Sequence, residues 1–413
     1  IGALSFLNKA MATATQRYLS YNRGKGIEQL GKVFNTSLIL HVLIGFLFVV
    51  VLEICGLFLF DGFLNIESSR LAAAKFVFHC MVASTFFSVI AVPYDAIMNA
   101  KENMLAFSII AIIDSLLKLI LAFYLSRCTY DRLIVYGACI SVISFCSVLF
   151  NQVYTKIKYK EFRINFGKYF SKEYFKQIFE FAGWNTLGAV AMIGRNQGVA
   201  VIFNLFCGTV ANAAYGIANQ VNGVLGYFSS TFQKALNPQL MQSEGMHDRS
   251  RLIRISLISS KYSVWVIALF AIPLIAEMPY VLKLWLKDVP EYTLRLSQLI
   301  LVLAIVYQYS VGLMSSIQAV GKIKNYFIVM SVLILMNLPV CYCVLKFGMP
   351  LYYSIIVFII IEFISTLYIL SIADSIILLL ISITFLIVEG CSRISFSRLI
   401  MVIYLHSFDF YIS

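Results

Sequence analysis

The sequence has few charged residues. Only 13% of its 413 residues are Asp, Glu, Lys or Arg, whereas 61% are hydrophobic. In a typical soluble domain, about a quarter of the residues are charged and roughly half are apolar. So few charges could not keep a chain of this length in water, and the shortage excludes a soluble globular protein.

Motifs for metal, redox and nucleotide chemistry are also missing. The nine cysteines form no CxxC motif, and Cys341 and Cys343 are separated by one residue inside a hydrophobic run. No Walker sequence is present, which excludes ATP binding by that route. We therefore expect no enzymatic activity, no cofactor and no metal site.

Long hydrophobic runs dominate what remains. A hydrocarbon layer of roughly 30 Å needs about 20 apolar residues in a helix. By this measure we predict eleven spans, at residues 1–18, 36–60, 74–97, 105–126, 131–153, 183–206, 211–236, 255–277, 294–317, 325–346 and 350–371. The sequence predicts an all-α polytopic membrane protein.

Basic residues gather in every second connection. The connections after spans one, three, five, seven and nine hold Arg17, Arg23, Lys25, Lys32, Lys101, Lys156, Lys158, Lys160, Arg163, Lys168, Lys172, Lys176, Arg249, Arg251, Arg254, Lys322 and Lys324. The other connections hold fewer, with Arg127, Lys283 and Lys287 as exceptions. Because Lys and Arg are retained on the cytoplasmic side, we predict that the basic connections face the cytoplasm. This distribution explains the net charge of +12 without a nucleic-acid partner.

A segment rich in Lys and aromatic residues divides the chain. Residues 162–181 have the composition of a helix at the headgroup boundary, with a solvated charged loop as the alternative. We therefore predict an N-terminal transmembrane lobe at 1–155, a basic cytoplasmic or interfacial linker at 156–182, a C-terminal transmembrane lobe at 183–371 and a hydrophobic tail of unassigned structure at 372–413.

The two lobes form an internal repeat. An offset of 222 residues pairs Asn103 with Asn325, both at predicted cytoplasmic helix ends. The helix at 183–206 has no counterpart in the first lobe, so we expect one helix to be missing before Ile1. Two lobes repeated in the same direction favour a transporter whose substrate site lies between them near mid-membrane.

Arg195 lies near the centre of its predicted span, beside Asn196 and Gln197. A charge at this depth costs about 2.5–3.5 kcal/mol on insertion scales, so it is expected to face a protein interior or a wet cavity. A guanidinium suits an anion such as phosphate. A structural arginine paired with an acid is the alternative.

Asp114 and Lys118 are one helical turn apart in span 105–126, an order that favours an intrahelical ion pair. Mutual neutralisation and a role of Lys118 as a substrate contact both fit this spacing.

Span 211–236 has a face of small and polar residues: Asn212, Tyr215, Gly216, Asn219, Asn222, Gly223 and Gly226. Such a face suits either a polar lining for sugars or headgroups, with Asn219 and Asn222 as contacts, or close helix packing with hydrogen bonds between helices.

Four segments resemble those of a known family: Ala14–Ser20 followed by Gly24–Gly26, Val92–Ala96, Asn212–Val221 and Pro279–Leu286. Over residues 1–370 the chain resembles the polysaccharide-export flippases of the multidrug/oligosaccharidyl-lipid/polysaccharide superfamily. The resemblance implies a two-lobed MATE-like bundle, V-shaped, with six helices in each lobe, in the bacterial cytoplasmic (inner) membrane.

The resemblance also implies a function. Members of this flippase family flip undecaprenyl-pyrophosphate-linked oligosaccharides, which are units of O-antigen, capsule or exopolysaccharide. They do so by alternating access coupled to an ion such as H⁺ or Na⁺. Their cavities are cationic, which Arg195 and, less closely, Lys118 would match. Expected partners are the lipid-linked oligosaccharide, membrane lipids and other polysaccharide-assembly membrane proteins.

Two alternatives stay open. A MATE-type cation-coupled multidrug exporter would need an acidic site at mid-membrane, for which Asp114 is the candidate. A scaffold without transport activity in a glycan-assembly complex is the other alternative.

Overall fold

The computed structural model describes residues 5–60, 67, 69–159 and 161–372, so the predicted tail beyond residue 372 lies outside it. All regular structure in this part of the chain is helical, which confirms the all-α prediction. The helices are α1 (Ser5–Tyr21), α2 (Ile27–Phe58), α3 (Leu71–Ala100), α4 (Met104–Arg127), α5 (Arg132–Lys158), α6 (Phe166–Tyr169), α7 (Lys172–Gly245), α8 (Arg249–Ala276), α9 (Met278–Leu286), α10 (Thr293–Val320), α11 (Lys324–Lys346) and α12 (Tyr352–Ile372).

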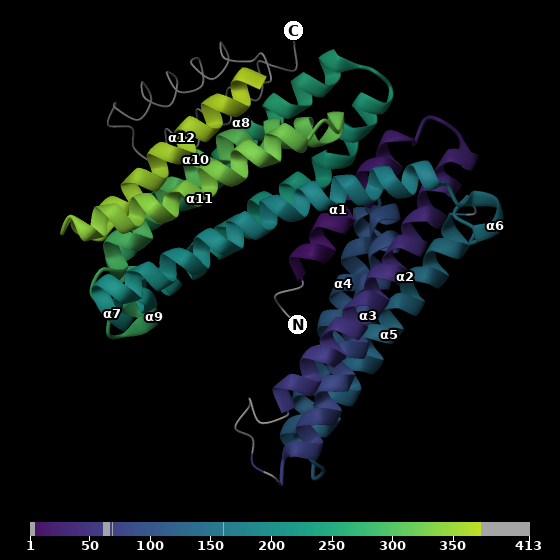
Figure 1. Ribbon diagram of the computed structural model, residues 1–413, viewed down its shortest axis with the longest axis horizontal. Helices are drawn as coiled ribbons and strands as arrows, with labels where there is room; N and C mark the ends of the chain where they lie inside the picture. Colours follow the sequence, from purple (N-terminus) through teal and green to yellow (C-terminus); the bar gives the residue numbers. More distant parts are fainter. Residues whose placement is uncertain (1–4, 61–66, 68, 160, 373–413) are drawn as a thin grey trace.

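Nine of these helices, all except α1, α6 and α9, are long and apolar enough to cross a membrane. One of them, α7, has 74 residues and is broken at Gly208, where φ is +76° and ψ is −172°. Glycine alone adopts this conformation without steric cost. The chain reverses there (Figure 1), and the ring centroids of Phe203 and Tyr215 lie 5.2 Å apart across the hairpin. The predicted spans 183–206 and 211–236 are the two arms of this hairpin.

The predicted span 1–18 differs from the others. With 17 described residues, α1 is shorter than the helices that are long and apolar enough to cross a membrane. The helix packs against α2, α3 and α7, and it buries Thr15, Arg17 and Ser20. Protein neighbours therefore enclose its polar residues, an arrangement that hydropathy alone does not distinguish from a lipid-facing span.

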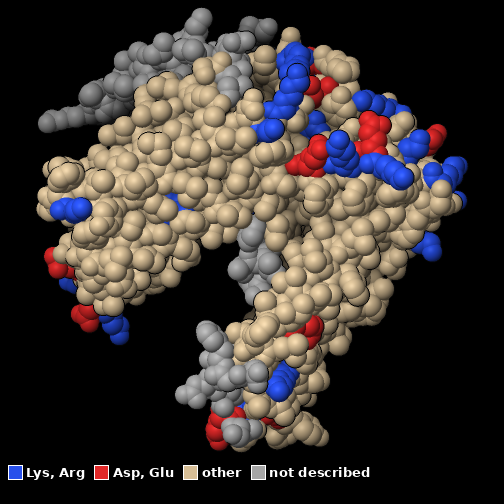
Figure 2. Space-filling view, viewed as in Figure 1, with Lys and Arg blue, Asp and Glu red and all other residues tan. Residues whose placement is uncertain are grey.

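The helices form two lobes that meet at one end and diverge at the other (Figure 1). One lobe contains α2 to α5, the other α7, α8 and α10 to α12, and α1 lies at their junction. Lys and Arg gather at the closed end, and the surface is hollowed between the diverging lobes (Figure 2). We call the closed end the basic end; it contains residue 159 and the segments 22–26, 101–103, 161–171, 246–248 and 321–323.

Ion pairs tie the connections of the basic end together. Arg23 Nη1 lies 2.6 Å from Glu102 Oε1, and Lys101 Nζ lies 2.7 Å from Glu161 Oε1. Burial acts to raise the pKa of Glu161, but the hydrogen bond from Lys101, a backbone hydrogen bond and the charge of Lys101 together outweigh it, so the pKa falls below the usual value. This contact therefore stabilises the fold above the usual glutamate range and is lost as the pH falls through the lowered pKa. Basic connections that were predicted to face the same side of the membrane therefore contact one another at the basic end.

The segment 162–181 is not one continuous helix. It contains the single turn α6 and then the first turns of α7. The side chain of Asn165 accepts a hydrogen bond from Lys168 N at 3.2 Å, and that of Ser171 accepts one from Tyr174 N at 3.4 Å. Each is an N-cap that restarts the helix in a new direction. The prediction of one interfacial helix was therefore wrong in extent.

The helix boundaries reproduce the internal repeat. Adding 222 to the first residues of α2 and α3 gives 249 and 293, the first residues of α8 and α10. The same shift places the starts of α4 and α5 at 326 and 354, two residues past the starts of α11 and α12. The two lobes thus have helices of matching order and position along the chain.

Arg17 joins α1 to the C-terminal lobe. It is 6% exposed, and its Nε donates to the carbonyls of Gln318 at 2.8 Å and Ala319 at 3.2 Å, while its Nη2 donates to that of Val320 at 3.1 Å. The last carbonyls of a helix have no partner within it and form the negative end of its dipole. Gly321 follows them with φ +86°, and a Cβ there would lie 2.1 Å from Arg17 Nη2.

Gly321→Ala is expected to destabilise the protein more than Gly348→Ala. Both glycines have positive φ, +86° and +74°, so both substitutions carry a backbone strain of about 1–3 kcal/mol. Only at Gly321 does the new methyl group displace Arg17, since a Cβ at Gly348 meets nothing within 4 Å. Thermal unfolding of the purified protein in detergent measures the difference. Equal losses in melting temperature would show that the Arg17 contact contributes nothing.

Candidate functional site

Arg195 lies in the first arm of α7, half-buried in the C-terminal lobe. Its Nε and Nη2 donate to Oδ1 of Asn196 at 3.2 and 3.1 Å. The ion pairs formed by the described residues do not include it. Gln197, the third predicted contact of this group, is exposed. The guanidinium therefore keeps a net positive charge at this depth.

A buried acid, Glu362 of α12, lies near Arg195. It is 8% exposed, and its Oε1 is buried without a hydrogen-bond partner among the described residues. The charge of Arg195 acts on this carboxyl group and on the hydroxyl groups of Tyr215 and Tyr307. Helices α7, α10 and α12 thus place one cation, one acid and two phenols together. We call these four residues the C-lobe cluster.

Our sequence reasoning missed Glu362. The signal was present, since an acid inside an apolar run is costly and marks a functional candidate by the same argument applied to Arg195. The alternative prediction was that Arg195 is a structural arginine paired with an acid. Glu362 lies within electrostatic range of Arg195, but the two side chains do not form an ion pair.

The polar face of the second arm of α7 adjoins the C-lobe cluster. Asn219 Nδ2 donates to the carbonyl of Tyr215 at 2.9 Å, one turn away, and Asn222 is half-buried on the next turn. A Cβ added at Gly216, Gly223 or Gly226 would meet nothing within 4 Å. Close helix packing therefore does not explain these three glycines, and this face is open.

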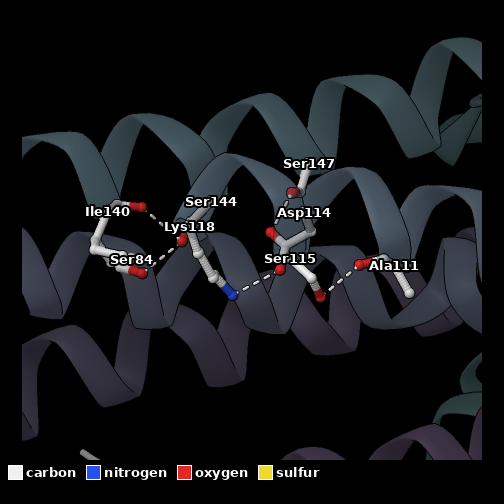
Figure 3. A network of polar contacts seen from close by, with 8 residues as sticks. All are labelled: Ser84, Ala111, Asp114, Ser115, Lys118, Ile140, Ser144 and Ser147. Carbon is white, nitrogen blue, oxygen red and sulfur yellow. Dashed lines mark hydrogen bonds and ion pairs between the residues drawn. The ribbon is translucent and has the colours of Figure 1, made fainter. Parts of the chain in front are cut away.

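Asp114 and Lys118 form the predicted intrahelical pair in the other lobe (Figure 3). Lys118 Nζ lies 2.6 Å from Asp114 Oδ2, and Ser147 of α5 donates to Asp114 Oδ1 at 3.1 Å. The acid is thus neutralised by its own helix and also held by the neighbouring one. The structure brings Arg195, Asn196 and Asn219 into one region of the C-terminal lobe, whereas Asp114 and Lys118 both lie on α4 of the other lobe.

Among the described residues, no group of three or more His, Cys, Asp or Glu side chains could hold a metal ion. The polar groups of the C-lobe cluster instead offer one cationic and one acidic point in a mostly apolar lobe.

The fold is that of MATE transporters. The chain aligns with a MATE crystal structure in the straight conformation at TM-score 0.75 and 14% identity, covering 88% of this chain and 82% of that one. An outward-facing multidrug resistance MATE transporter of the MOP superfamily aligns at TM-score 0.74 and 14% identity, with coverages of 90% and 85%. A MOP superfamily transporter from Pyrococcus furiosus, described as having a binding pocket of reversed polarity, aligns at TM-score 0.76 and 13% identity, with coverages of 89% and 83%. No protein-family model and no curated protein matches the sequence.

These likenesses define an all-helical, multi-pass membrane protein with a MATE-like fold, as the sequence predicted. At 13–15% identity they establish the fold alone.

Gly223→Ala is expected to preserve or raise stability, and Gly188→Ala to lower it. Alanine gains about 1 kcal/mol over glycine inside a helix, and the space beside Gly223 is open. A Cβ at Gly188 would lie 2.7 Å from the ring of Phe327, which is buried, so overpacking of about 1–3 kcal/mol is expected. Thermal unfolding of both variants tests whether the first arm of α7 is closely packed at Gly188 while the second arm is open at Gly223. A loss at Gly223 as large as that at Gly188 would contradict the open face.

Proposed function

We propose that the protein is a transporter that flips a lipid-linked oligosaccharide, carried on undecaprenyl pyrophosphate, from the cytoplasmic to the periplasmic leaflet of the bacterial inner membrane. The observation that carries the proposal is Arg195, a half-buried cation inside the C-terminal lobe that is not part of an ion pair among the described residues. A cation kept at this depth needs an anion, and a diphosphate offers bidentate oxygens to a guanidinium.

The glycan and the prenyl chain of the cargo would each contact a surface of matching polarity. The glycan hydroxyls would lie along the open face that carries Asn219 and Asn222, where amide groups donate and accept hydrogen bonds. The prenyl chain would stay in lipid at the opening between the lobes, which diverge away from the basic end (Figure 2). Lys118 would add a second cationic contact only if Asp114 released it.

Alternating access would follow from the two lobes. The conformation described is closed at the basic end and open at the other, so the cycle requires that the contacts at the basic end break. An ion such as H⁺ or Na⁺ would bias this exchange. Other membrane proteins of polysaccharide assembly would supply and remove the cargo.

Arg195→Ala is expected to lower flipping of a prenyl-pyrophosphate oligosaccharide in proteoliposomes by roughly ten- to a hundredfold, because removing one charged hydrogen-bonding group costs about 1.5–3 kcal/mol of binding. Arg195→Lys should retain part of the activity, since it keeps the charge but loses the bidentate geometry. The measurement is protection of the fluorescently labelled lipid from a membrane-impermeant reagent under an imposed ion gradient.

Arg295→Ala is the matched control for this experiment. Arg295 is exposed at the far end of α10, with its guanidinium carbon 5.1 Å from the ring centre of Tyr352. The control should flip at the wild-type rate. Full activity of Arg195→Ala at wild-type abundance would remove the proposed anchor.

A MATE-type multidrug exporter is the second candidate, and Glu362 is the observation that favours it. A cationic drug or coupling ion needs an acid inside the membrane, and Glu362 is buried with an oxygen that lacks a hydrogen-bond partner among the described residues. Asp114 is less suited, because Lys118 already neutralises it.

Efflux of a cationic dye distinguishes the two candidates. The exporter predicts that Glu362→Gln abolishes efflux while Asp114→Asn has a smaller effect. The flippase predicts no dye efflux by the wild type at all.

A further inference from the structure

A pocket of about 630 Å³ lies at the basic end, where α1, α2 and the start of α7 meet. This volume falls in the range of roughly 300–1,000 Å³ found for small-molecule sites. The wall includes Lys25, Gln29, Lys32, Ser171 and Tyr174. None of the C-lobe cluster lines it, so it is a separate feature of the molecule.

Cations outnumber acids in the wall of this pocket. Arg17, Lys25 and Lys32 line it, with Glu173 as the acid. The carboxylate of Glu173 already accepts a hydrogen bond from Gln177 Nε2 at 3.0 Å. The pocket therefore has a net positive charge that suits an anionic ligand.

Of the three cations in the pocket wall, Lys25 is the most available to bind a ligand. Lys32 is occupied by Glu28, 2.8 Å away, and Arg17 by the carbonyls at the end of α10. Lys25, in the connection between α1 and α2, forms no ion pair with any described residue. Its Nζ lies 4.1 Å from the ring centre of Tyr21, which holds the ammonium group at the pocket without neutralising it.

Neutral donors complete the wall. The Tyr174 hydroxyl lies 3.3 Å from Asn22 Oδ1 and 3.2 Å from Gln29 Oε1, and its single hydrogen serves one of these at a time. The amide nitrogen of Gln29 and the hydroxyl hydrogen of Ser171 have no acceptor among the described residues. Donors from α2 and from the start of α7 thus surround the Lys25 ammonium.

We propose that this pocket binds a phosphate-bearing anion, held by the ammonium of Lys25 and by the donors of Gln29 and Ser171. Such an anion would bridge the connection between α1 and α2 to the first turn of α7, and so stabilise the closed basic end. A soluble phosphate compound and the headgroup of an anionic lipid both carry this chemistry, and anionic lipids are present in the cytoplasmic leaflet. The inference does not depend on the cargo proposed above.

The first test measures binding of radiolabelled inorganic pyrophosphate to the purified full chain in detergent. We expect saturable binding by the wild type and binding weaker by roughly tenfold in Lys25→Gln, because a charge-assisted contact is lost. Gln29→Leu, which keeps every charge, should also weaken binding. Lys322→Gln is the matched control, since Lys322 is exposed at the basic end but does not line the pocket.

Equal binding by the wild type and Lys25→Gln would overturn the proposal, as would an equal loss in Lys322→Gln, which would indicate a diffuse charge effect. The same comparison is made in an Arg195→Ala background, which removes the diphosphate contact proposed for the C-lobe cluster. Lys25→Gln should weaken pyrophosphate binding there to the same extent, and an unchanged affinity would overturn the proposal.

The second test identifies the source of the anion. The protein is placed in nanodiscs of phosphatidylcholine alone or with phosphatidylglycerol, and pyrophosphate binding is measured in each. Displacement of pyrophosphate by phosphatidylglycerol would support a lipid headgroup as occupant, and undiminished binding would support a soluble anion. Failure to bind in both kinds of nanodisc would overturn the proposal.

Discussion

The contact between the guanidinium of Arg17 and the last carbonyls of α10 holds the two lobes together at the basic end. A buried guanidinium needs acceptors for its hydrogens, and the end of a helix supplies unpaired carbonyls with the matching partial charge. The ring centres of Tyr18 and Phe181 lie 4.6 and 5.1 Å from the guanidinium carbon, so both rings pack against the contact. The V shape of the molecule depends on this junction, because the lobes diverge beyond it.

Glycine positions explain how the C-terminal lobe keeps one surface packed and another open. A Cβ at Gly312 would lie 2.2 Å from the carbonyl oxygen of Ser256, so α8 and α10 approach as closely as their backbones allow. Small residues commonly permit such approaches between membrane helices. By contrast, Gly216 and Gly223 border open space, and the C-lobe cluster lies beside their helix. The same residue type thus builds the core of the lobe and leaves room beside the polar groups.

Hydropathy and local spacing predicted much of this fold but not its junction. Apolar runs located the membrane helices, and the one-turn spacing of Asp114 and Lys118 predicted their ion pair, because both signals are local in the sequence. Arg17 was read as a charge of a cytoplasmic connection, yet it is buried against residues three hundred positions away. The interaction of Glu362 with Arg195 is likewise long-range. Local patterns carry no information about which distant helix encloses a polar group.

The internal repeat does not duplicate the junction. The offset of 222 residues places Arg17 on Gln239 and Gly321 on Asn99, so the second copy has neither the guanidinium nor the glycine that admits it. In the alternating access proposed above, opening the basic end would therefore break one contact of this kind rather than two. The carbonyls at the end of α10 would then accept hydrogen bonds from water, and the guanidinium would be hydrated. Water would thus replace the broken hydrogen bonds of this junction, whereas separation of an apolar contact would expose apolar surface, a difference that would suit the proposed alternating access.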